Sequence, residues 1–293
     1  LDHDHRLLLA QGHEFLQVRR FGETHHAEIG GMNAQDESGP GSDRVREVGY
    51  ARSVRGPHFA QLSPAQKVLA WHLSQAAIAG RDIYWDQRYA HGLEMRDVLE
   101  AVLRHRGSVD PATLVAVERY TKLFWLNSGP YNNLTARKFV LSCTPEQLAA
   151  AVASAALAGA KFPTREGETL DQLLERLGPM FFDASFEPSV TTKTPPPGKD
   201  ILNASFNNLY SGVSMADLGR FTERYPLNSR LVKRDGTLVE EPYRVGGRYD
   251  ASIRQIVGHL EAAIPFATEP MARALRALVK WYQTGEAADR RAY

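Results

Sequence analysis

Four helix-start signals constrain the fold of this chain more than any other feature. Ser63, Asp110 and Thr144 are each followed directly by proline, and Thr169 has a glutamine three residues later. Ser, Thr and Asp side chains accept hydrogen bonds from the unpaired N–H groups of a first helical turn, and proline fits the first helical position. Apolar residues at helical spacing follow these signals. Residues 58–182 are therefore predicted to form a helical bundle.

The ends of these helices are predicted from glycine and proline, which disfavour helix interiors. Gly80 is expected to end the helix that starts at Ser63, and Gly178-Pro179 the one that starts at Thr169. A further helix is expected over about residues 93–104.

The residue composition changes in the last third of the chain. Pro195–Gly198 is typical of a turn-rich linker. Asp235-Gly236 lies between two short apolar runs and predicts a β-hairpin, because both residues tolerate positive φ. Two more helices are expected, over about 251–264 and 270–282. The fold class is therefore α+β and mainly helical, with 183–293 as a hairpin-containing part of the same lobe.

Residues 1–57 form a polar, histidine-rich opening segment. Within it, Phe15–Phe21 reads as a strand, and residues 30–41 read as a loop because they are rich in Gly, Ser, Asp and Asn.

The histidines show no pattern of a built metal site. His3 and His5 flank an aspartate, but a cluster of this kind near a terminus lacks preorganised geometry. His13-Glu14 begins like a zinc-protease motif, yet Gln17 stands where the second histidine belongs. The remaining helical-segment histidines are interpreted as surface or core residues: His72, His91, His105 and His259. We therefore predict no metal ligand in this chain.

Charge and composition exclude several functional classes. Lys plus Arg (35) nearly equals Asp plus Glu (34), so bulk charge favours neither nucleic acid nor an anionic membrane as a partner. The longest apolar run, Leu148–Ala160, is well short of the roughly 20 residues that span a bilayer. The single cysteine, Cys143, excludes an intramolecular disulfide and is expected to be an inert, partly buried thiol. We expect a cytoplasmic location, with a periplasmic or secreted one left open.

Two segments combine aromatic and polar residues densely. Residues 124–133 carry three aromatics, three asparagines, a glycine and a proline. Such a loop suits recognition of an extended polar ligand such as a peptide, and a packed corner explains it equally well. In residues 79–89 a structural role is favoured, with Arg81 paired to Asp82 or Asp86 and the rings wedged between helices.

Five stretches occur in a recognisable order and spacing: Gly80–Gln87, Phe124–Gly129, Lys138–Val140, Leu227–Lys233 and Tyr243–Tyr249. In them the chain resembles the dipeptidyl-peptidase III family of zinc exopeptidases, particularly its bacterial members. The resemblance runs from about Phe59 to Tyr293.

The resemblance implies one part of a two-lobed enzyme. In that family a helical upper lobe holds zinc through a His-Glu-x-x-Gly-His helix and a downstream glutamate. The lower lobe, built around a small antiparallel β-barrel or sheet, helps to hold the peptide as an added strand. This chain resembles the N-terminal part of the lower lobe and contains no His-Glu-x-x-Gly-His. No catalytic or metal residue is therefore assigned to it, and zinc is expected only in the complete enzyme.

The family's counterpart of residues 127–139 borders the cleft, which makes four residues expected peptide contacts: Asn127, Tyr131, Asn132 and Asn133. Leu134 stands where some relatives place an aromatic, which removes a stacking contact there.

Three hypotheses follow. The first is the peptide-binding lobe of a dipeptidyl-peptidase III-like enzyme, inactive alone, with peptide as substrate and a zinc-bearing part in cis or in a separate chain as partner. The second is a non-catalytic peptide- or protein-binding domain that uses the same lobe. The third, weaker, is a different hydrolase that uses His3 and His5 with acidic partners.

Overall fold

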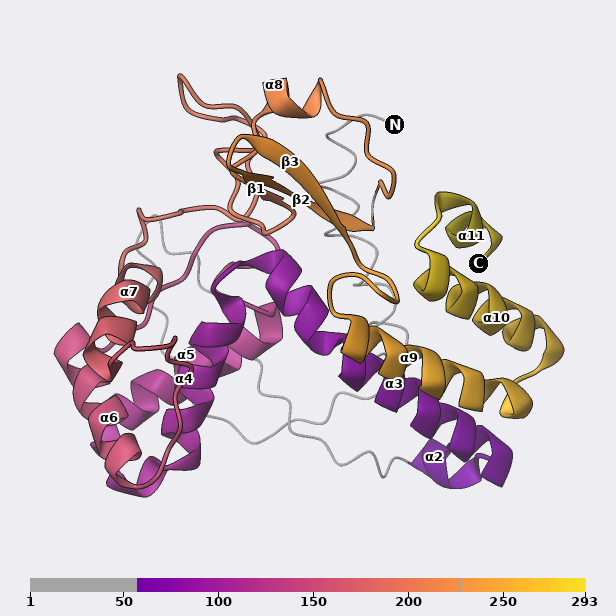
Figure 1. Ribbon diagram of the computed structural model, residues 1–293. Helices are drawn as coiled ribbons and strands as arrows, with labels where there is room; N and C mark the ends of the chain where they lie inside the picture. The colour runs from indigo at the N-terminus through magenta and orange to yellow at the C-terminus, as the bar shows by residue number, and fades with distance from the viewer. Residues whose placement is uncertain (1–56, 227) are drawn as a thin grey trace. The chain divides into compact units, whose positions relative to one another are not determined.

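The structure is a computed structural model that describes residues 57–226 and 228–293 (Figure 1). The predicted strand Phe15–Phe21, the loop 30–41 and the histidines near the N-terminus lie outside these residues.

Helices occupy most of the first part that the structure describes, and the predicted caps begin them. Ser63, Thr144 and Thr169 each accept a hydrogen bond from the backbone N–H of a glutamine three residues on, and that glutamine's side chain accepts one from the cap's own N–H. Asp110 accepts one from the Thr113 N–H. The elements are α2 (Pro57–Gln61), α3 (Pro64–Arg88), α4 (Gly92–Arg104), η1 (Arg106–Ser108), α5 (Pro111–Asn127), α6 (Pro145–Leu157) and α7 (Leu170–Phe182).

Two predicted helix ends are wrong because tertiary packing overrides local preference. α3 continues through Gly80 to Arg88. A Cβ atom at Gly80 would lie 3.0 Å from the Ile256 side chain, so glycine is what allows another helix to approach α3 closely. α7 continues through Pro179 to Phe182, and the residues after the proline, among them Phe181, are buried in the core.

The first core lies among α4, α5, α6 and α7 and includes the end of α3. Trp85 of α3 packs against Phe124 of α5, with ring centroids 5.2 Å apart. Arg81 lies 3.5 Å from Asp82, as one of the two predicted pairings requires. Cys143 is buried here, and burial raises the pKa of its thiol; its lack of reactivity stays a prediction.

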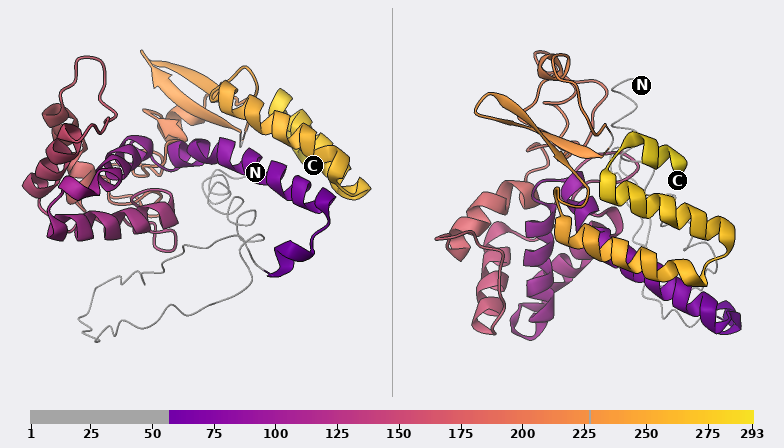
Figure 2. Two further views of the ribbon diagram at one scale, coloured as in Figure 1. Left: turned by 90° about the horizontal axis from the view of Figure 1, so that it is seen from below. Right: turned by 45° about the vertical axis from the view of Figure 1, so that its right-hand side comes forward.

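The second core joins α3 to the C-terminal helices. These are α9 (Asp250–Ala263), η2 (Ile264–Phe266), α10 (Glu269–Thr284) and α11 (Ala287–Ala292). α9 lies alongside α3, and α10 packs on α9 (Figures 1 and 2). Ala76 of α3 is buried with Ile253 and Leu260 of α9 and Leu275 of α10. α3 therefore contributes side chains to both cores.

A small sheet and the short helix α8 (Met215–Leu218) complete the described fold. β2 (Ser229–Arg234) and β3 (Thr237–Pro242) form the predicted hairpin, with positive φ at Asp235 (49°) and Gly236 (77°). The short strand β1 (Tyr210–Ser211) joins β2 in parallel, so the sheet is mixed, in the order β1-β2-β3. The α+β, mainly helical class is confirmed.

Two further observations bear on the sequence analysis. The proposed boundary between 58–182 and 183–293 coincides with the end of α7, and the division of the chain into three segments remains a prediction. In the part of the chain that the structure describes, no helix is both long enough and apolar enough to cross a bilayer.

Candidate functional site

The aromatic and amide-rich segment after α5 folds as a small irregular hairpin. Ser128 adopts left-handed φ (51°) and ends α5. The chain then turns back on itself, because the Asn132 N–H donates to the Arg137 carbonyl (2.8 Å) and the Phe139 N–H donates to the Pro130 carbonyl (2.9 Å). The tip of this hairpin exposes Leu134, with 92% of its side chain open to solvent.

A second extended segment, residues 188–190, pairs with the returning arm of this hairpin. Arg137 and Ser189 form an antiparallel bridge. The Lys138 N–H donates to the Pro188 carbonyl (3.0 Å), and the Val190 N–H donates to the Ala136 carbonyl (2.9 Å). The two arms of the hairpin and the distant segment 188–190 thus lie side by side.

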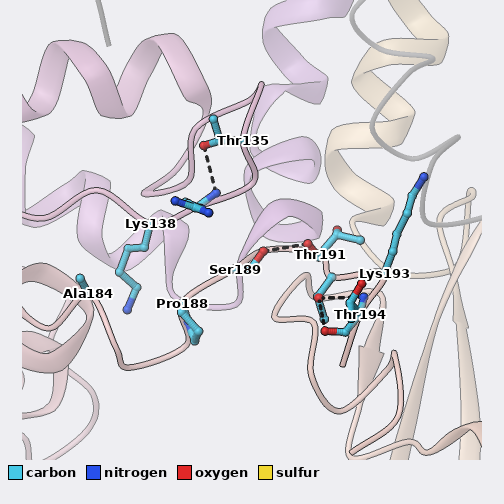
Figure 3. A pocket seen from close by; sticks show the side chains of 10 residues that line it. Thr135, Lys138, Ala184, Pro188, Ser189, Thr191, Lys193 and Thr194 are labelled. Carbon is cyan, nitrogen blue, oxygen red and sulfur yellow. Dashed lines mark hydrogen bonds between the residues drawn. The ribbon is translucent and has the colours of Figure 1, made fainter. Parts of the chain in front are cut away.

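A pocket of about 490 Å³ opens along these two segments (Figure 3). Its lining contains three cationic side chains, five hydroxyls and no carboxylate. Figure 3 shows Lys138 and Lys193 on opposite sides of it. The lining residues are Thr135, Arg137, Lys138, Ala184, Pro188, Ser189, Thr191, Thr192, Lys193 and Thr194.

Lys138 shapes the pocket from a buried position. Its ammonium donates to the carbonyl of Asp183 (3.2 Å) and to that of Phe186, whose ring lies 5.1 Å from the nitrogen. Desolvation lowers the pKa of Lys138, because burial disfavours its charged form. This side chain therefore ties the loop that follows α7 to the hairpin, and its positive charge adds to the field in the pocket.

Hydrogen bonds with backbone groups order the hydroxyls. Ser189 Oγ donates to the carbonyl of Thr191 at 2.7 Å or to that of Ala136 at 3.1 Å. Thr192 Oγ1 donates to the Thr194 carbonyl and accepts from the Thr194 N–H, both at 3.2 Å. A loop rich in Thr and Pro is thus held in one conformation beside the cationic groups.

Buried tyrosines anchor the pocket to the end of α3. Tyr131 donates its hydroxyl to the Glu187 carbonyl (2.9 Å), and Tyr89 donates to the Glu187 carboxylate. Arg88 donates to the Tyr131 carbonyl (3.1 Å). Burial raises the pKa of the Tyr131 hydroxyl above its ordinary range, so it remains a donor.

None of the four residues expected to contact peptide lines the pocket. Tyr131 is fully buried, and Asn127 is 5% exposed. The Asn127 side chain donates to the Leu123 carbonyl and accepts from the Asn133 N–H. Asn132 Oδ1 accepts from the N–H groups of Leu134 (2.8 Å) and Thr135 (3.0 Å). Their role as peptide contacts stays a prediction.

The sequence analysis missed most of the pocket. Residues 191–194, Thr-Thr-Lys-Thr, directly precede the predicted linker Pro195–Gly198 and were not singled out. Three threonines and a lysine in succession are a signal for a polar binding surface, which only the pairing with residues 136–138 makes visible.

Comparison with solved structures shows a distant similarity. No known family matches the chain, and no curated protein matches it. The chain is similar to the solved structure of DPP III from Caldithrix abyssi, with 16% sequence identity and a TM-score of 0.47. The match covers 80% of this chain and 33% of that one, so this chain spans about one third of the length of that protein.

Proposed function

We propose that this chain is the peptide-binding lobe of a dipeptidyl-peptidase III-like zinc exopeptidase, an enzyme that releases dipeptides from peptide N-termini. The observation that carries the proposal is the pocket along residues 135–138 and 188–194, because its extended walls and polar lining suit an extended peptide. The five sequence stretches that resemble this family, from Gly80–Gln87 to Tyr243–Tyr249, support it.

The chemistry of the lining indicates the kind of peptide. Hydroxyls donate to and accept from backbone amides, and cations attract carboxylates. Since the lining carries three cationic side chains and no carboxylate, a peptide with acidic side chains or a free C-terminal carboxylate is favoured over a basic one.

The residues that the structure describes do not provide the ligand set of a catalytic zinc site. The sequence has no His-Glu-x-x-Gly-His. Among residues 57–226 and 228–293 no group of three or more His, Cys, Asp and Glu side chains is placed to hold a metal ion. We therefore assign no hydrolytic step to these residues. Their role in the proposal is to bind and orient the peptide, and the zinc-bearing partner would be a further part of the same protein or a separate chain.

A second candidate is a binding domain without catalysis. It is favoured by the fact that the pocket is built wholly from residues of this chain. A reading frame that continues into a His-Glu-x-x-Gly-His segment supports the enzyme, whereas a natural stop after Tyr293 supports the binding domain.

Fluorescence anisotropy with a labelled acidic octapeptide tests the proposed pocket. We expect binding to weaken about tenfold, or about 1.4 kcal/mol, in Arg137→Gln and in Lys193→Gln. Lys161→Gln removes the same charge from an exposed residue outside the pocket and should bind like the wild type. Equal affinity in all four proteins, or no binding at millimolar peptide, would overturn the proposal.

A further inference from the structure

Two histidines from distant parts of the chain face each other across the α3–α9 contact. His72 of α3 and His259 of α9 are 187 residues apart in the sequence, yet their Nδ1 atoms lie 3.4 Å apart. Their ring centroids are 5.7 Å apart, so the two nitrogens lie between the rings. Both side chains are half-buried, which leaves the pair open to a small solute.

A hydrogen bond is a poor account of this contact. Between two neutral imidazoles one Nδ1 must donate and the other accept, and such bonds usually measure about 2.7–3.2 Å between heavy atoms. The observed 3.4 Å is longer. Two protonated rings would instead place like charges against each other.

The spacing fits a shared cation better. Imidazole nitrogens lie about 2.0–2.1 Å from zinc, and the tetrahedral angle then places two of them about 3.3 Å apart. The observed separation of the two Nδ1 atoms, 3.4 Å, nearly equals this distance. A tilt of each ring would bring both lone pairs onto one point between the helices.

We propose that His72 and His259 form a two-histidine site for a zinc-class divalent cation that clamps α3 to α9. Water completes the coordination, since the residues that the structure describes offer no third metal-binding side chain here. With two protein ligands the site is exchangeable and weaker than a closed structural zinc site. Neither histidine lines the peptide pocket.

Trp71 provides a local reporter for this site. Its ring lies 4.7 Å from the His72 ring and 5.7 Å from the His259 ring, centroid to centroid, and it is 55% exposed. A paramagnetic stand-in for zinc, such as Co²⁺, bound between the histidines should quench Trp71 fluorescence.

Thermal unfolding of the full chain at pH 7.5, with and without ZnCl₂, tests the proposal. Ligand that binds only the folded state raises Tm, and we expect a rise of about 4 °C in the wild type. The rise should vanish in His72→Gln and in His259→Gln and persist in His105→Gln. The N-terminal histidines are present in every variant, so binding there cannot produce the difference.

A second measurement separates the site from a loss of structure. Co²⁺ quenching should disappear in both histidine variants, whereas Trp71→Phe should lose part of the quenching and keep the zinc-dependent rise in Tm. If a glutamine variant loses its helical circular dichroism, the double variant His72→Leu, His259→Leu keeps an apolar contact between the helices and serves instead. An equal rise in Tm in the wild type and these variants, or no rise in the wild type at millimolar zinc, would overturn the proposal.

Discussion

Asp86 and Arg248 form a two-pronged ion pair between the last turn of α3 and the segment that follows the hairpin. Both carboxylate oxygens of Asp86 accept from the guanidinium, at 2.8 to 3.1 Å. Asn208 donates a further hydrogen bond to Asp86 (3.1 Å). The Asp86 side chain is only 8% exposed, so these partners, in place of water, compensate its carboxylate.

Removing one member of this pair should destabilise the protein strongly. We expect Asp86→Ala to lower the free energy of unfolding by about 3 kcal/mol, because it removes the buried partner of the Arg248 guanidinium, which then keeps only the longer contact with Glu241 (3.4 Å). Asp97→Ala is the matched control, since that side chain is 47% exposed, and it should cost about 1 kcal/mol or less. Urea unfolding followed by circular dichroism measures both. If both variants lost the same free energy of unfolding, the buried ion pair would contribute no more than an exposed one.

Gly247 should not tolerate any side chain. A Cβ atom there would lie 2.2 Å from the Pro242 carbonyl oxygen, so backbone must move to accept it. We expect Gly247→Ala to cost about 3 kcal/mol, at the upper end of overpacking effects. Gly258→Ala, in an open position on α9, should instead stabilise by roughly 0.5–1 kcal/mol through helix preference. Thermal unfolding should therefore show a lower Tm for Gly247→Ala and a higher Tm for Gly258→Ala than for the wild type.

Alkaline pH should weaken the fold through its buried tyrosines. Burial raises the pKa of Tyr249 to about 12 and raises those of Tyr89, Tyr120, Tyr131 and Tyr243 as well. Above pH 10 the unfolded chain loses these protons and the folded chain keeps them, so stability falls as pH rises from about 10 toward the folded-state values. Absorbance at 295 nm at pH 11 should show fewer tyrosinates in the native protein than in urea. Identical spectra would refute this.

Glu168 should contribute stability that acid removes. Its hydrogen bonds with Arg176, at 2.7 and 2.9 Å, lower its pKa to about 2 from the usual 4.5, and the Arg165 N–H adds to the effect. The unfolded chain binds the proton first as pH falls, so this contribution is complete above about pH 4.5 and disappears toward pH 2. Glu168→Gln should therefore have a lower Tm than the wild type at pH 7, with the gap closing near pH 2. Glu166→Gln, at an exposed residue of the same loop, provides the control.

Local signals in the sequence predicted the helix starts and the hairpin, because caps and turns depend on neighbouring residues. The ends at Gly80 and Pro179 were mispredicted because contacts with distant residues decide them. Packing overrides the preference of a single glycine or proline when the residues beyond it are buried.

The candidate site could be predicted only in part. The segment that contains Tyr131 was singled out, with a ligand-binding loop and a packed corner as equal alternatives, but its partner at residues 188–194 is joined to it by long-range backbone pairing. The same holds for His72 and His259, which lie on one surface only because α9 packs on α3. The spacing of residues along the sequence does not predict such long-range contacts.

The continuity of α3 couples the melting of the two cores. Its middle turns, from Leu69 to Ile83, pack into the core shared with α9, and Trp85 in its last turns packs against Phe124 of α5, with no break at Gly80. If the contacts of one core are lost, α3 frays and the other core loses part of its support. The two cores should therefore unfold cooperatively, because they share one helix. We therefore expect the two cores to unfold in a single sharp transition, with the same midpoint by helical circular dichroism and by tryptophan fluorescence.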